Sequence, residues 1–384
     1  MIPQNSSTPA NQTTRREQTN NNVSPTLPYS WKKYVEGIHG TPPYERAHHS
    51  SIITDNDKLF IFGGHDASGN ILNDLAIFDL QKNCWDNASV NRFVTIKNRK
   101  LQVIDAYSKQ IHLNSSQELS TPPLGRAYHT AVFSKPNMIV VGGYPSGVDC
   151  DIYFLDVMTL TWSKFNMENT PPEVRTSRSQ HSASMWNDKM VVFGGIHGST
   201  PLNSLIIFDT IKFKWLVLPN NLPPTYAHSS FVRDDMLFVI GGCTSKGNNS
   251  FMAVSLKDGT TLATSNYIPK FNLNSRFLTS VYDKESGLVY IFGGYSVNAD
   301  NEENGCNNTL FIVDMNKKKE KCITSSMFIS SEEYPPPRCG HSMNLYKGKL
   351  IMFGGCDRLP LLNGEWVFCD FSHFIWAFEQ NQEN

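Results

Sequence analysis

A pair of adjacent glycines recurs six times in this chain, each time directly after a short apolar run. The pairs are Gly63-Gly64, Gly142-Gly143, Gly194-Gly195, Gly241-Gly242, Gly293-Gly294 and Gly354-Gly355. Successive pairs are 79, 52, 47, 52 and 61 residues apart. Self-similarity at a period of roughly 50 residues indicates a repeat architecture. Each unit makes only a few short strands and cannot bury both faces alone, so neighbouring units have to pack on one another.

The stretch from Pro171 to Trp215 is the most complete unit. Its features follow in a fixed order: a Pro-Pro turn, Arg178, His181, an apolar run into Gly194-Gly195, a second apolar run into Asp209, and Trp215. The same order recurs in the other units, with losses. Unit four has Thr225 where an arginine is expected, and unit five has Arg276 with Thr279 in the histidine position.

Each feature of the unit has a physical role. A short, continuously apolar run bounded by turn residues favours a strand that is buried on both faces. A glycine pair permits positive φ and close approach of a neighbouring backbone. The aspartate can accept hydrogen bonds from the turn that follows it. A tryptophan is large enough to fill the space between sheets, so structural roles are expected for the glycine pairs and for three tryptophans, Trp85, Trp162 and Trp215.

The glycine doublet, the aliphatic run to an aspartate and the tryptophan six residues later resemble the Kelch repeat. The resemblance covers roughly residues 29 to 376. It implies an all-β fold, a six-bladed Kelch-type β-propeller with four-stranded antiparallel blades. Residues 1–28 are polar and poor in aromatics, and predict a disordered tail ahead of a propeller over residues 29–380. The long first interval predicts an insertion near residues 86–121, either idle or a binding element.

The two ends of the chain offer two ways to complete the last blade. Trp31 precedes a Pro-Pro turn much as the other tryptophans do, so residues 31–35 can add the fourth strand to a blade built from residues 338–370. The competing choice makes Trp376–Glu379 that fourth strand. Either arrangement leaves few open sheet edges, which suits a monomer.

Composition limits the classes of partner. The formal net charge is −1, from 34 basic and 35 acidic residues, which argues against nucleic acid and membrane surfaces as partners. No run of 18 apolar residues is present, and the N-terminus lacks the apolar segment of a secretory signal. Eight cysteines without a CxxC pair favour reduced thiols, so we expect a cytoplasmic protein.

Motifs of catalysis and metal binding are weak or absent. The sequence has no HExxH, no GxSxG and no phosphate-binding glycine loop. The repeated histidines, present in five of the six units (His49, His129, His181, His228 and His341), are expected to be hydrogen-bonded members of the core. Cys339 follows Arg338, where a thiolate could be favoured, but it occupies a strand position filled elsewhere by Ala47 or Ala127. We therefore expect no enzyme activity, no cofactor and no metal.

The resemblance implies a non-enzymatic scaffold or adaptor that binds a protein partner. The alternatives are an enzyme on a Kelch propeller, either an oxidase or a sugar epimerase, and an actin-binding structural protein. The loops before the first strand and after the second strand of each blade must share one face. Candidate partner-binding residues on that face are Arg46, Arg126, Arg178, Arg276, Arg338, His65, Tyr144 and Tyr295. Guanidinium groups mixed with aromatic rings predict an acidic or phosphorylated ligand, although each arginine could instead brace its own blade.

Overall fold

The structure is a computed structural model of the chain. It describes residues 29–34, 39–86, 96–97, 100–101, 117–119, 122–145, 152–165, 167, 170–244, 247–248, 251–262, 275–296, 305–328, 334–357 and 375–380. The predicted tail at residues 1–28 and most of the predicted insertion lie outside this range. Of the insertion, the short strands β6 (Ile96–Lys97) and β7 (Lys100–Leu101) pair with each other.

Six sheets of four or five strands contain most of the strand residues in the described part of the chain. Sheet 1 contains β2 (Ser50–Ile53), β3 (Lys58–Phe62), β4 (Leu75–Asp79) and β5 (Cys84–Trp85). Sheet 2 contains β9 (Thr130–Ser134), β10 (Asn137–Val141), β11 (Ile152–Asp156), β12 (Thr161–Phe165) and an outer strand, β8 (Gln117–Leu119). Sheet 3 contains β13 (Ser182–Trp186), β14 (Lys189–Phe193), β17 (Leu205–Asp209) and β18 (Lys214–Leu218).

The remaining three sheets repeat the pattern. Sheet 4 contains β20 (Ser229–Arg233), β21 (Met236–Ile240), β24 (Phe251–Ser255) and β25 (Thr261–Leu262). Sheet 5 contains β27 (Thr279–Asp283), β28 (Leu288–Phe292), β31 (Leu310–Asp314) and β32 (Lys319–Ile323). Sheet 6 contains β33 (Ser342–Tyr346), β34 (Lys349–Phe353), β35 (Ile375–Gln380) and β1 (Tyr29–Tyr34). All pairings within these sheets are antiparallel.

Short elements occupy the connections. They are β15 (Ile196–His197), β16 (Thr200–Pro201), β19 (Thr225–Tyr226), β22 (Cys243–Thr244), β23 (Gly247–Asn248), β26 (Ser275–Arg276), β29 (Tyr295–Ser296), β30 (Gly305–Cys306), the helical turn α1 (Pro172–Arg175) and the 3-10 turn η3 (Ser325–Met327). No helix in the described part of the chain has the length and apolar character needed to cross a membrane.

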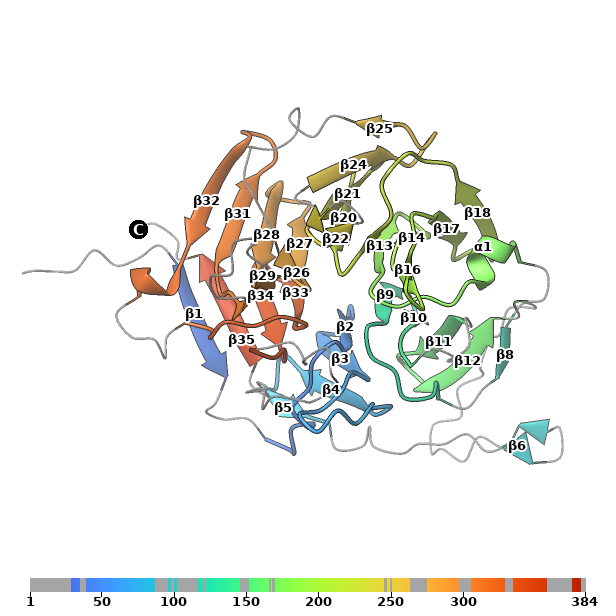
Figure 1. Ribbon diagram of the computed structural model, residues 1–384. Helices are drawn as coiled ribbons and strands as arrows, with labels where there is room; N and C mark the ends of the chain where they lie inside the picture. The colour runs from blue at the N-terminus through green and yellow to red at the C-terminus, as the bar shows by residue number, and fades with distance from the viewer. Residues whose placement is uncertain are drawn as a thin grey trace, which may run out of the picture.

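The first strands of the six sheets lie side by side around a common centre (Figure 1). Each sheet contributes one residue with positive φ just before its first strand, and the backbone N–H of that residue donates to the carbonyl of its counterpart in the preceding sheet. These residues are His48, Tyr128, Gln180, Ala227, Phe277 and Gly340. The His48 N–H donates to Gly340 O at 2.7 Å, so the six hydrogen bonds run in a cycle that joins sheet 1 to sheet 6.

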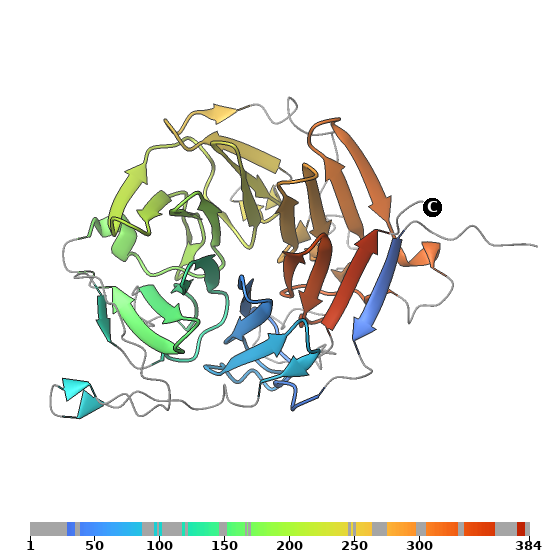
Figure 2. The same ribbon diagram turned by 180° about the vertical axis from the view of Figure 1, so that it is seen from behind.

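The two ends of the described chain meet in sheet 6. β1 pairs with β35 along its whole length, and β35 pairs with β34 (Figures 1 and 2). The N-terminal strand is therefore the outermost strand, while Ile375–Gln380 is the third strand of this sheet. The predicted range of 338–370 for the other strands of this blade therefore ends short of the third strand, and the alternative that makes Trp376–Glu379 the fourth strand differs from the observed pairing.

Aromatic side chains fill the spaces between neighbouring sheets. Trp162 of sheet 2 packs on Phe62 of sheet 1, with ring centroids 5.2 Å apart. Trp85 of sheet 1 packs on Phe353 of sheet 6 at 5.7 Å. Trp215 is half-buried and lies 6.2 Å from Phe165 of sheet 2. Such contacts place the apolar core between sheets, where each unit depends on its neighbour.

The glycine pairs mark the points where successive sheets come closest. All twelve glycines have positive φ. At Gly63, an added Cβ would lie 2.6 Å from the carbonyl oxygen of Arg126 in the next sheet. A side chain at this position would therefore force the two sheets apart, in addition to straining the backbone.

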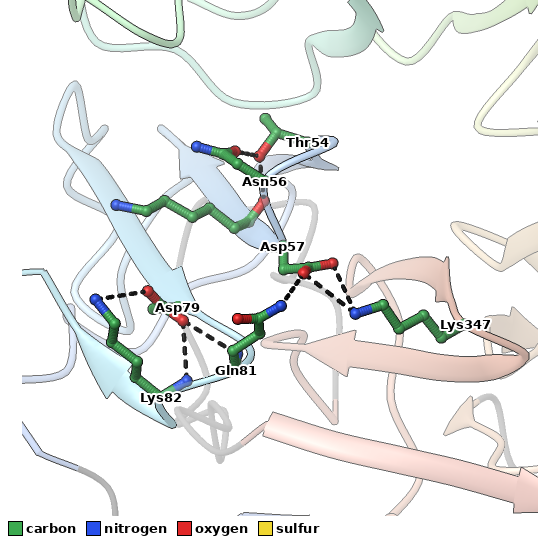
Figure 3. Close-up of polar contacts among 8 residues, drawn as sticks. Thr54, Asn56, Asp57, Asp79, Gln81, Lys82 and Lys347 are labelled. Atoms are coloured by element: carbon green, nitrogen blue, oxygen red, sulfur yellow. Dashed lines mark hydrogen bonds and ion pairs between the residues drawn. The ribbon is translucent and has the colours of Figure 1, made fainter.

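The opposite end of the sheets carries tight turns stabilised by aspartates (Figure 3). The Asp79 carboxylate accepts the backbone N–H groups of Gln81 and Lys82, at 3.1 and 2.9 Å. Asp156, Asp209 and Asp314 repeat this arrangement, which confirms the role predicted for the repeated aspartate. Asp57 accepts a hydrogen bond from Gln81 and pairs with Lys347 of sheet 6 at 3.1 Å, linking the first and last sheets.

Candidate interaction face

Six backbone pairings define one end of the molecule. Each joins the third residue before a sheet's first strand to the residue just after its glycine pair. The pairs are Ala47–His65, Ala127–Tyr144, Ser179–Ile196, Tyr226–Cys243, Arg276–Tyr295 and Cys339–Cys356. We call these the bridge pairs and the end that carries them the bridge face. The loops that enter the first strands and the loops that leave the second strands meet here, as expected for antiparallel sheets.

Four of the five candidate arginines are buried on this side: Arg46, Arg126, Arg178 and Arg338. In each, Nη1 donates to the carbonyl of the first glycine of the same sheet, over 2.8–3.2 Å. Three of them also donate Nε to the carbonyl two residues earlier, at Tyr44, Leu124 and Pro336. These guanidinium groups therefore brace the entry loop against the glycine turn of their own sheet.

Arg46 also pairs with a carboxylate. Its side chain is fully buried and forms two hydrogen bonds with the Asp74 carboxylate, at 2.8 and 2.7 Å. Arg178 donates instead to Ser204 Oγ and to the carbonyl of Glu173. Burial lowers the pKa of Arg178 to about 10, which leaves the group charged at neutral pH. The Arg126 guanidinium lies 5.0 Å from the centre of the Tyr153 ring.

Arg276 does not occupy the bracing position. The carbonyl oxygen that lies against Gly241, in the glycine turn of sheet 4, belongs to Ser275 of the next sheet. The corresponding carbonyls against Gly63 and Gly142 belong to Arg126 and Arg178. Likewise Leu278, not Thr279, lies where the repeated histidine lies, against Gly241. The arginine and histidine positions predicted for unit five, Arg276 and Thr279, were thus each one residue too late in the sequence. The cause is a longer hairpin between β27 and β28, which spaces Leu278 farther from its glycine pair than the histidines are from theirs.

The one-residue shift changes the surroundings of Arg276. It belongs to a bridge pair with Tyr295 and is only partly buried. Its Nε is buried without a hydrogen-bond partner among the described residues. A hydrogen bond with Cys243 raises the pKa of the neighbouring Tyr226, and the charge of Arg276 opposes that rise. Arg276 therefore places a cation among the bridge pairs.

The repeated histidines connect neighbouring sheets. His129 Nε2 hydrogen-bonds with Ser50 Oγ at 2.8 Å, and His181 Nε2 hydrogen-bonds with Thr130 Oγ1 at 2.8 Å. His228 and His49 make the same contact with Ser182 and Ser342. Burial lowers the pKa of His129 to about 3, so this imidazole is neutral in the folded protein. These contacts account for four of the five repeated histidines as parts of the framework, whereas the buried ring nitrogens of His341 have no hydrogen-bond partner among the described residues.

The other candidate residues differ in their accessibility. His65 is buried and its ring stacks on His48, with centroids 5.3 Å apart. Tyr295 is half-buried beside Ala47, Cys339 and Cys356. Tyr144 exposes 48% of its surface and is open to a partner. The structure therefore brings these three residues to one face but leaves Tyr144 the most exposed of them.

Two exposed apolar residues on this face were not among the predicted site residues. Tyr44 is 78% exposed and Leu124 is 70% exposed, and both lie in the entry loops of adjacent sheets. Each stands two residues before a bracing arginine that binds its carbonyl oxygen. This spacing from the repeated arginine is the sequence signal that could have predicted the two exposed side chains. An arginine that holds the backbone carbonyl leaves the side chain of that residue free to point outward.

Comparison with known proteins identifies the same repeat. Residues 46–89 match the Kelch motif, and residues 95–270 match the KLHDC2/KLHL20/DRC7 Kelch-repeats domain. Kelch domain-containing protein 3 of Rattus norvegicus is 28% identical over 232 residues, covering 56% of this chain and 52% of that protein. The human protein of the same name is 27% identical over 239 residues, covering 57% and 53%.

A plant relative matches a longer part of the chain. Acyl-CoA-binding domain-containing protein 5 of Arabidopsis thaliana is 22% identical over 308 residues, covering 69% of this chain and 47% of that protein. The chain thus spans about half the length of these curated relatives. Three findings agree with one another: the motif matches, the region shared with relatives named for the Kelch domain, and the repeated four-stranded sheets. The chain is a Kelch-repeat protein.

Proposed function

We propose that this protein is a closed, six-bladed Kelch propeller that acts without catalysis as a platform for a protein partner, which binds on the bridge face. The cycle of backbone hydrogen bonds from His48 to Gly340 supports closure, because each sheet contacts two others through its first strand. The pairing of β1 with β35 supports a last blade built from both ends of the described chain. Sheet 1 through sheet 6 are then the six blades.

The observation that carries the proposed binding face is the presentation of Tyr44 and Leu124. Both side chains are largely exposed, yet their backbone carbonyls are held by buried guanidinium groups. Exposed apolar side chains on a rigid backbone lose little conformational entropy when a partner covers them. Tyr144 adds a third exposed side chain, at the same end of sheet 2 as Leu124. Large, anchored side chains of this kind are typical of binding hot spots.

The chemistry of Arg276 supports an acidic or phosphorylated segment as the ligand. Arg276 is half-buried as a residue, and its buried Nε has no hydrogen-bond partner among the described residues. Carboxylates and phosphates satisfy guanidinium donors through charge-assisted hydrogen bonds. The four bracing arginines act in this proposal as supports for the loops. Binding should weaken at high salt because the charge pair lies near the surface.

Affinity purification with mass spectrometry tests this function. The wild-type protein is compared with Arg276→Glu and with a Tyr44→Ser/Leu124→Ser double variant. Ile211→Ser serves as the matched control, because Ile211 is 65% exposed but lies in a turn at the opposite end of sheet 3. We expect both face variants to lose the same partner while retaining the wild-type melting temperature, and the control to keep it. Face variants that keep every partner, or a control that loses them, would contradict the proposal.

A further inference from the structure

Three ligand-bearing side chains converge at the junction of sheets 1 and 6. The imidazole of His48 and the thiols of Cys339 and Cys356 each place a ligand atom within 4.8 Å of the others. All three residues are buried. The two sulfur atoms are 3.8 Å apart. A third cysteine, Cys306 of sheet 5, hydrogen-bonds to Cys339 and lies 3.5 Å from the Cys356 carbonyl oxygen.

The backbone explains why these residues meet. Cys339 and Cys356 form a bridge pair with two reciprocal N–H···O bonds, of 2.8 and 3.0 Å, so their side chains extend on the same side. The His48 N–H closes the hydrogen-bond cycle on Gly340, the residue next to Cys339. A Cβ at position 340 would lie 2.5 Å from His48 Cε1, so the glycine leaves the room that the imidazole occupies.

Packing alone does not account for this choice of residues. In sheets 1 and 2 the position of Cys339 is filled by Ala47 and Ala127, so a methyl group suffices there. His48 is 6% exposed, and its Nε2 is buried without a hydrogen-bond partner among the described residues. A buried polar atom left in this state costs free energy unless something binds it. Four of the five repeated histidines, by contrast, satisfy Nε2 with a neighbouring hydroxyl, and only His341 among them shares the unpaired state of His48 in the described residues.

We propose that His48, Cys339 and Cys356 form a binding site for a thiophilic metal ion, with Zn²⁺ as the ion it fits best. Zinc prefers thiolate and imidazole ligands in tetrahedral geometry. Two thiolates at a Zn–S distance of about 2.3 Å in that geometry lie roughly 3.8 Å apart, which matches the two sulfur atoms here. Cys306 lies next to these three residues, where it can supply the fourth ligand of the ion or shield the ion from solvent.

A bound ion would join the first sheet to the last. His48 precedes the first strand of sheet 1, whereas Cys339 precedes the first strand of sheet 6 and Cys356 follows its second strand. Each cysteine thiol would release its proton to the solvent on binding, because the thiolate is the ligand. An ion that binds the folded state raises the stability of that state in proportion to the logarithm of its free concentration. The site therefore predicts a zinc-dependent melting temperature.

The test uses the untagged full chain, reduced and freed of metal with a chelator that is then removed. Zn²⁺ is titrated calorimetrically, and Co²⁺ is added in a parallel experiment because cobalt–thiolate absorption reports sulfur ligation. We expect one equivalent of tight binding, a higher melting temperature with zinc, and cobalt–thiolate bands. A Cys339→Ala/Cys356→Ala variant should lose all three effects, and alanine already occupies positions 47 and 127, which match Cys339. His48→Ala should weaken binding at least tenfold.

Cys243→Ser provides the matched control, because Cys243 occupies the position of Cys356 in sheet 4 but has no thiol partner in its bridge pair. This variant should bind zinc as the wild type does. Reduced wild-type protein that binds no more zinc than the double-alanine variant would overturn the proposal. An equivalent of zinc retained by the double-alanine variant would also overturn it, because the ion would then bind elsewhere in the chain.

Discussion

Sheets 1 and 5 share one backbone frame but use different side chains at its two supporting positions. Sheet 1 has Arg46 bracing its glycine turn and His49 bonded to Ser342 of the neighbouring sheet. Sheet 5 has Ser275 and Leu278 at these positions. Both sheets keep the positive-φ residue and its place in the backbone hydrogen-bond cycle. Glycines and backbone pairing therefore define the repeat, and one sheet can lack both the arginine and the histidine.

The comparison also shows how a small shift changes the role of an arginine. Successive side chains of an extended strand point in opposite directions. An arginine moved by one residue therefore leaves the buried bracing position and joins the bridge pairs, as Arg276 does. In sheet 1 the same bridge position holds Ala47, which is fully buried. Arg276 thus places a cation on the bridge face at a point where the sequence departs from the repeat.

The largest expected effect lies in the acid stability of the framework. Burial lowers the pKa of His129, His228 and His341 to about 3 in the folded protein. In the unfolded chain these groups titrate near 6.5, so the unfolded state binds more protons below that pH. Stability should be complete above pH 6.5 and fall as the pH is lowered toward 3. Each histidine contributes about 1.4 kcal/mol per pH unit in this range.

Urea unfolding between pH 7.5 and 5 measures this loss. His228→Asn should be less stable than the wild type at pH 7.5 but should show a shallower dependence on pH, because one buried group no longer titrates. A wild-type midpoint that stays constant between pH 7 and 5 would show that the imidazoles are protonated in the folded state.

The second prediction separates the two arginine roles. Arg46→Ala removes the partners of Gly63 O and of the Asp74 carboxylate, and we expect a loss of about 3 kcal/mol in the free energy of unfolding. Arg276→Ala should cost about 1 kcal/mol or less, since no bracing contact is removed. Denaturant unfolding of both variants provides the measurement. Equal losses would mean that both arginines support the fold, and the contrast between sheets 1 and 5 would fail.

The smallest expected effect comes from restoring the repeat in sheet 5. Leu278→His would place an imidazole toward Ser229, the counterpart of the serine that bonds His228. Ser229 already bonds Ser280 at 2.8 Å, so we expect a change of less than about 1 kcal/mol at pH 8. The free energy of unfolding of the variant should fall more steeply than that of the wild type as the pH is lowered, because the variant has one more buried group that titrates. Leu278→Met is the control, and an identical pH profile for both variants would show that the imidazole stays solvated.

Much of the fold could be predicted because its signals are local. Apolar runs before the glycine pairs form the second strands, as in Met190–Phe193 within β14. The turn role of Asp79 follows from its position at a strand end. The equivalences in sheet 5 were wrong because they were counted back from Gly293 through a hairpin of different length. Only pairing with the adjacent sheet reveals that Ser275 and Leu278 fill the two supporting positions.

The sequence by itself determined the repeat, the strands and the turns, because these depend on residues within a few positions of one another. The tertiary structure decided which side chains are accessible and which meet. Four arginines that look available for a partner are buried, since the glycine turn of their own sheet lies against them. His48 and Cys339 come together although they are nearly the whole chain apart, because backbone hydrogen bonds join sheet 1 to sheet 6. No local spacing encodes that contact, so only the packed sheets bring the thiols and the imidazole together.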